Sequence, residues 1–170
     1  MNAVFKREFK SYFSTPIGFI VLAAFYFFLG LFFSLIYQSG NPDISMVIMA
    51  MSTVAVFTMP VLTMRLMSED RRQKVDQALL TAPVKLTGIV LGKFFAALAV
   101  FALGFAPTVI FEIIIASYVS VNVMSYIYAL FGMLLLGSAL IAIGMFISSL
   151  TESSVISAIL TLVINILVLY

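Results

Sequence analysis

Long apolar stretches separated by short polar ones dominate the chain. A helix needs about 20 apolar residues to cross roughly 30 Å of hydrocarbon, because its backbone amides must bond within their own segment. Four stretches reach that length, at residues 17–37, 44–67, 89–117 and 124–150. A fifth starts at 154 and is about four residues short of a crossing when the sequence reaches residue 170. We therefore predict an all-α polytopic membrane protein, with residues 1–170 forming one transmembrane domain that ends inside a helix.

The cations fall on one side of the membrane if the spans alternate in direction. Three of the nine precede the first span, and the others lie at or between the ends of the second and third spans: Lys6, Arg7 and Lys10, then Arg65, Arg71, Arg72, Lys74, Lys85 and Lys93. Cytoplasmic loops carry an excess of Lys and Arg. The pattern predicts a multi-pass protein of the cell membrane with a cytoplasmic N-terminus and a cytoplasmic loop at 68–87.

An interfacial helix is predicted for residues 1–14. Aromatic side chains recur at helical spacing on one face and cations occupy the other: Phe5, Phe9, Tyr12 and Phe13 against Lys6, Arg7 and Lys10. This pattern is typical of a helix that lies in the headgroup layer with its apolar face toward the acyl chains. The alternative is a disordered basic tail that only sets the topology.

The loop at 68–87 combines charges of both signs with a short apolar stripe. Residues 69–74 are almost all charged, and Val75, Ala78, Leu79 and Ala82 then follow at helical spacing before Pro83. A helix of this kind suits a protein surface better than a lipid surface. The alternative is a connector that packs beneath its own bundle.

The composition removes most catalytic chemistry. The chain is 64% hydrophobic and 9% charged and contains no His and no Cys, so the usual zinc and thiol sites cannot form. Residues 88–93 resemble a phosphate-binding loop, but only three residues separate the glycines and Phe94 follows the lysine. We interpret this segment as a close helix contact in which Lys93 extends to the cytoplasmic interface. We expect no enzyme activity, and no cofactor or metal site, in this chain.

Individual polar, small and kink-forming residues in the spans add four expectations. Glu112 lies 19 residues after Lys93, which is about 28 Å along a helix, so we favour an outer-boundary acid over a proton relay. Pro60 and Pro107 can kink their helices. Close packing is expected at Gly137 and Gly144 of the fourth span. A hydrogen bond to another helix is expected for Asn165 in the fifth span.

Several segments together carry a family resemblance. They are Phe5–Phe13, Pro16-Ile17-Gly18, Met64-Arg65-Leu66, Glu69–Lys74, Asp76–Val84 and Leu91-Gly92-Lys93-Phe94. In these segments the chain resembles the membrane subunit of an ABC-2-type ATP-binding-cassette transporter, in the branch that includes gliding-motility-type permeases. Lys74-Val75 stands where many relatives carry Gly-Thr.

The resemblance implies a permease of six spans in a prokaryotic cytoplasmic membrane, with residues 1–14 as a connecting helix and a coupling helix in the 68–87 loop. That helix would dock on a separate ATPase subunit that binds ATP and Mg²⁺, and two such subunits would serve two permeases, identical or different. The implied coupling residues are Glu69, Arg71, Arg72, Asp76, Leu79, Leu80 and Pro83. The implied function is the transport, by export, of an unidentified substrate. The alternatives are a fragment of an ion-coupled secondary transporter and a membrane scaffold that transports nothing.

Overall fold

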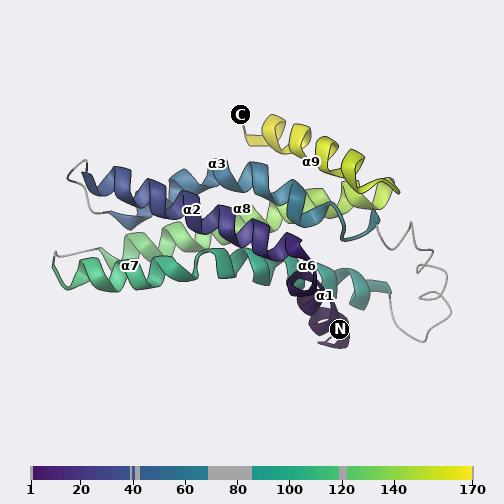
Figure 1. Ribbon diagram of the computed structural model, residues 1–170, viewed down its shortest axis with the longest axis horizontal. Helices are drawn as coiled ribbons and strands as arrows, with labels where there is room; N and C mark the ends of the chain where they lie inside the picture. Colours follow the sequence, from purple (N-terminus) through teal and green to yellow (C-terminus); the bar gives the residue numbers. More distant parts are fainter. Residues whose placement is uncertain (1, 39, 41–42, 69–85, 119–121, 170) are drawn as a thin grey trace.

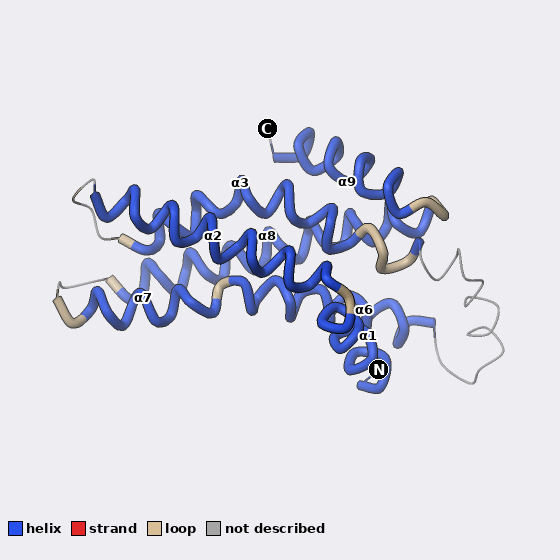
Figure 2. Tube along the Cα trace, viewed as in Figure 1, coloured by secondary structure: helices blue, strands red, loops and turns tan. Residues whose placement is uncertain are grey.

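The computed structural model describes residues 2–38, 40, 43–68, 86–118 and 122–169, and these residues form helices without any strand (Figures 1 and 2). In chain order the helices are α1 (Asn2–Ser14), α2 (Pro16–Gln38), α3 (Ile44–Thr63), α6 (Leu86–Gly104), α7 (Ala106–Ala116), α8 (Val123–Leu150) and α9 (Ser154–Leu169). The prediction of an all-α fold is confirmed.

Four helical stretches within the described part of the chain are long and apolar enough to cross a membrane: Pro16–Gln38, Ile44–Thr63, Thr87–Ala116 and Val123–Leu150. They lie side by side as a bundle in which α3 packs between α2 and α8, while α6 contacts both α2 and α8 (Figure 1). Helix α9 lies along α3 and α8. Helix α1 runs at an angle to α2 and packs beside α6 at one end of the bundle.

The outside of the bundle is apolar and several of its buried side chains are polar. Large side chains such as Phe27, Phe131 and Leu167 are exposed, whereas Thr63, Thr108 and other hydroxyl residues are buried. A water-soluble protein has the opposite arrangement. In lipid, small polar residues are favoured between helices and apolar ones outside, so this distribution fits a membrane environment.

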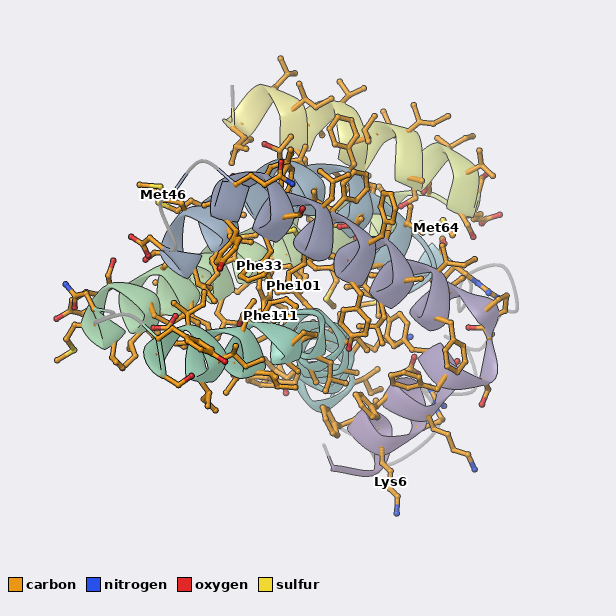
Figure 3. The ribbon with its side chains drawn as sticks, turned by 60° about the vertical axis from the view of Figure 1, so that its left-hand side comes forward. Lys6, Phe33, Met46, Met64, Phe101 and Phe111 are labelled. Carbon is orange, nitrogen blue, oxygen red and sulfur yellow. The ribbon has the colours of Figure 1, made fainter. Side chains whose placement is uncertain are left out.

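The helices pack around a group of aromatic rings in the interior. The Phe101 ring meets the Phe25 and Phe105 rings edge to face, with centroids 5.5 and 5.2 Å away, and Phe33 stacks on Phe111 at 4.7 Å (Figure 3). A Cβ at Gly137 would overlap the Phe101 ring, so only glycine lets α8 approach α6 this closely. The close contact expected at Gly137 is therefore present.

The two prolines have different effects on their helices. Helix α6 ends at Gly104, and Pro107 lies in the first turn of α7, where a missing N–H costs no hydrogen bond. Helix α3 instead continues past Pro60 to Thr63, and the Met64 N–H donates to the Pro60 carbonyl at 2.9 Å. The expected kink is thus a helix break at Pro107, while α3 runs through Pro60.

Helix α9 turns a polar stripe toward its neighbours. Ser157, Thr161 and Asn165 are fully buried, and α9 contacts α3 and α8. Neither amide atom of Asn165 finds a hydrogen-bond partner among the residues that the structure describes. The expected interhelical hydrogen bond of Asn165 is therefore not observed, although the side chain does face other helices.

Candidate functional site: the end of helix α3

The proposed coupling residues lie outside the described residues. Glu69, Arg71, Arg72, Asp76, Leu79, Leu80 and Pro83 all fall between 69 and 85, and their assignment stays a prediction. The structure does describe Met64–Ser68, the turn that follows α3 and leads into this segment. The way this turn is held determines which helices a force on the loop would reach.

The side chain of Lys93 on α6 binds the turn at residues 64–68. Its ammonium group donates to the Leu66 carbonyl at 2.5 Å and lies 3.7 Å from the Glu8 carboxylate of α1. The side chain is only 1% exposed, so the expectation that Lys93 extends to the membrane interface is wrong. The physical reason is that a buried ammonium is tolerated when a carboxylate and a carbonyl replace its water.

Glu8 connects this buried cation to the membrane-facing helix. Its side chain is 15% exposed, and the same oxygen that faces Lys93 accepts a hydrogen bond from the Arg7 guanidinium at 2.7 Å. The carboxylate thus lies between an exposed cation and a buried one.

Tyr12 provides a second bond from α1 to α3. Its buried hydroxyl donates to the Leu62 carbonyl at 3.0 Å, one of the carbonyls that the end of the helix leaves without an intrahelical partner. Burial raises the pKa of the Tyr12 phenol, and the nearby Glu8 carboxylate adds to the rise. The phenol therefore stays protonated and continues to donate at alkaline pH.

Ser148 of α8 binds the backbone of the turn directly. Its Oγ accepts from the Met67 and Ser68 N–H groups at 3.1 and 3.0 Å. One turn earlier, a Cβ at Gly144 would overlap Thr63 of α3. The close packing expected at Gly144 is thus present, and it brings Ser148 within reach of the turn.

Helix α9 completes the contacts through Ser154, whose Oγ lies 3.2 Å from the Ser68 hydroxyl. We refer to the side chains that hold residues 62–68, together with the paired acid, as the α3-end junction: Glu8, Tyr12, Lys93, Ser148 and Ser154. Through these side chains, α1, α6, α8 and α9 all bind the end of α3 or the turn that follows it, immediately before residue 69.

The packing of α1 differs from the predicted interfacial arrangement. The Phe5, Phe9 and Phe13 rings follow one another with centroids 5.9 and 5.2 Å apart, and they pack against the bundle core. A Cβ at Gly92 would lie 3.0 Å from the Val4 side chain, so the close helix contact expected around this glycine is made with α1. The aromatic row is therefore partly buried against the bundle.

The cations of α1 point the other way. Lys6, Arg7 and Lys10 are exposed, and Figure 3 shows Lys6 directed away from the bundle. This exposed basic face suits anionic headgroups, but the placement of α1 in a headgroup layer stays a prediction.

The opposite end of the bundle carries Glu112. This residue is 9% exposed and lies on α7 one turn before that helix ends at Ala116. Nearby helices are joined by hydroxyl groups, with Thr108 and Tyr126 3.1 Å apart. The position is near the bundle end, where an outer-boundary acid was expected. Its role stays a prediction.

Sequence reasoning missed most of the α3-end junction. Tyr12 entered only as a member of an aromatic row, and Lys93 only as an interfacial cation, because their acceptors lie 50 and 27 residues away along the chain. Two signals were present in the sequence: a hydroxyl on one aromatic of the row, and an acid between the cations of α1. Among the described residues, no cluster of acidic side chains is suited to hold a metal ion.

Comparison with known proteins gives one match. A family model described as ABC-2 type transporter covers residues 1–170. Neither a curated protein nor a solved structure matches the chain.

Proposed function

The chain belongs to the ABC-2 type transporter family, and from this premise we propose that the α3-end junction transmits movement of the 69–85 loop to the transmembrane helices. The family assignment makes the chain a multi-pass membrane protein and the permease component of an ABC transporter. Such a component works with an ATPase subunit and does not itself hydrolyse ATP. The alternatives of a secondary-transporter fragment and a scaffold are thereby set aside.

The observation that carries the proposal is the Lys93–Leu66 bond together with the two N–H groups held by Ser148. These bonds hold the backbone of residues 66–68, directly before residue 69. A displacement of the loop would therefore act on α6 and α8 through these contacts. Interlocked side chains and helices are the physical means by which movement spreads in a packed protein. Without them, the same displacement would be absorbed by the turn.

The proposed partner of the loop is an ATPase subunit. Mixed charges at 69–74 would orient the contact, and Leu79 and Leu80 would bury apolar surface in it. The ATPase would bind ATP and Mg²⁺, and two ATPases with two permeases would form the complete transporter. Closure of the ATPases on ATP would pull or push the loops and alter the packing of the bundle.

The proposed topology follows from charge. The α1 cations and those near the end of α3 would lie in the cytoplasm, in the cytoplasmic membrane of a prokaryote. The family resemblance implies export, of a substrate that the residues do not identify. Membership of the gliding-motility branch stays a prediction from the resemblance.

The test is co-purification of the permease with the ATPase subunit. Replacing both Leu79 and Leu80 by Asp should abolish association, because two carboxylates would be desolvated in the contact. The matched control is Tyr118→Asp, a charge at the opposite bundle end where the side chain is 85% exposed. This control should bind as the unaltered chain does. Full association of the Leu79 and Leu80 variant would contradict the docking assignment.

A further inference from the structure

A groove of about 510 Å³ lies between the halves of α3 and α8 that are remote from α1. Its walls include Ser45, Met49 and Ser52 of α3 and Tyr128, Gly132 and Met133 of α8. This volume falls in the range of about 300–1,000 Å³ that is typical of small-molecule sites. None of the contacts of the α3-end junction uses it.

The mouth of the groove opens toward the outside of the bundle. Met49 and Tyr128 are each 68% exposed, and both belong to helices long and apolar enough to cross a membrane. Acyl chains are the groups that reach a cavity between two such helices wherever its mouth meets the bilayer. The methionines suit such an occupant, because their flexible side chains adapt to irregular apolar surfaces.

One end of the groove is polar and the remainder is mostly apolar, just as a lipid has a polar headgroup and apolar acyl chains. At the end where both helices begin, the Ser45 and Ser125 hydroxyls lie 3.0 Å apart, and Ser45 also donates to the Asp43 carboxylate. Toward the middle of the bundle the walls are mostly apolar, although they still include the Ser52 hydroxyl residue of α3. Ser125 and Leu136 mark its length on α8, which is about 16 Å and close to the thickness of one leaflet.

The charged residues near the groove favour one class of lipid headgroup over another. The sequence has no Lys or Arg between Lys10 and Arg65 and none after Lys93, so no cation among the described residues lies near this end of the bundle. The Asp43 carboxylate does lie there, where it accepts from Ser45. An anionic headgroup would be repelled by this carboxylate, whereas an ammonium group would be attracted to it.

We propose that the groove binds one acyl chain of an amine-bearing phospholipid of the ethanolamine type, with its ammonium group directed toward Asp43. The hydroxyls of Ser45 and Ser125 meet the polar part of this lipid, and Met49 and Met133 enclose its chain. The site is independent of the ATPase contact, so failure of one proposal leaves the other standing.

The test measures which lipid the purified full chain retains. The protein is exchanged into an equal mixture of phosphatidylethanolamine and phosphatidylglycerol with matched acyl chains, then washed in detergent, and the retained lipids are quantified by mass spectrometry. We expect phosphatidylethanolamine to be retained in roughly tenfold excess, a ratio that corresponds to about 1.4 kcal/mol.

Two glycines provide matched variants. A Cβ meets nothing within 4 Å at either Gly132 or Gly30, so phenylalanine is tolerated by the backbone at both. Gly132→Phe fills the groove and should lose most of the retained lipid. Gly30→Phe on α2 should retain it like the unaltered chain. Asp43→Asn keeps a capping side chain for α3 but should remove the preference between headgroups.

Each contrary result overturns the proposal. Equal retention of both lipids by the unaltered chain contradicts the role of Asp43, and full retention by Gly132→Phe contradicts the groove as the site. If Gly132→Phe leaves lipid retention unchanged but converts a dimer into monomers, measured by mass photometry, the occupant is a second copy of the chain.

Discussion

The two ends of the bundle are held together by different kinds of contact. At the α3-end junction a buried cation and hydroxyl groups bind the backbone of a single helix end. At the opposite end, helices are joined by paired hydroxyls such as those of Ser45 and Ser125. Bonds to backbone fix the course of a chain, whereas a hydroxyl pair is easily exchanged for water or a ligand. The first end therefore suits the transmission of movement that we propose, and the second suits the occupant that we propose for the groove.

Replacing Lys93 by Met should give the largest loss. The change leaves the Glu8 carboxylate facing an apolar side chain and removes the donor to Leu66. Breaking a buried ion pair costs about 3–5 kcal/mol, and the partial exposure of Glu8 reduces this to roughly 2 kcal/mol or more. Thermal unfolding of the purified chain measures the effect.

A double-mutant cycle provides the control for Lys93. Glu8→Gln combined with Lys93→Met removes both charges, so the double variant should be more stable than the sum of the two single losses predicts. Strict additivity would mean that the two side chains do not interact as the 3.7 Å separation indicates.

Gly144→Leu should have the next largest effect. The new side chain would overlap Thr63 and push α8 away from α3, moving Ser148 out of reach of the turn. Overpacking of this kind costs about 1–3 kcal/mol. The matched variant is Gly30→Leu, where the space is open, and it should unfold at nearly the temperature of the unaltered chain. Equal losses at the two glycines would contradict the contact.

Tyr12→Phe should cost about 1–2 kcal/mol, because the Leu62 carbonyl is left buried without its donor. Tyr26→Phe is the control, since its hydroxyl also donates to a carbonyl, that of Leu103, but at an exposed position. It should change the stability by a few tenths of a kcal/mol, as is usual for exposed positions. A larger loss of stability in Tyr26→Phe than in Tyr12→Phe would contradict the greater importance assigned to the buried hydrogen bond.

The same tyrosine predicts a dependence on pH. The pKa of Tyr12 is raised in the folded chain, so its stabilising contribution is complete below the unfolded-state pKa of about 10 and falls as the pH rises above that value. Stability measured between pH 9 and about 11 should therefore fall more steeply in the unaltered chain than in Tyr12→Phe. Parallel curves would argue against the raised pKa.

Ser125→Ala should have the smallest effect. It removes one member of a hydroxyl pair whose partner, Ser45, keeps its bond to Asp43, so we expect about 0.5 kcal/mol or less. Comparison with Ser148→Ala tests the difference between the two ends directly, because that change leaves two backbone N–H groups without their acceptor. Equal losses would show that both ends are held alike.

The sequence predicted the four long apolar helices well, because their length and hydropathy are read directly from residue type. The break near Pro107 and the close contacts at Gly137 and Gly144 were also foreseeable from residue type. The α3-end junction was not, since Tyr12 and Lys93 meet carbonyl groups, and every residue has a carbonyl. Only the three-dimensional path of the chain reveals which ones lie within reach.

The pairing of Lys93 with Glu8 also bears on biogenesis. An unpaired lysine near the start of a nascent hydrophobic segment adds to the cost of inserting that segment, although by less than the about 2.5–3.5 kcal/mol of a lysine at a helix centre. The counter-ion of Lys93 lies in α1, which the ribosome completes long before α6. We therefore expect the first helix to assist the insertion of the third span. Deleting residues 2–14 should accordingly leave that segment poorly integrated, even though it lies more than 70 residues downstream.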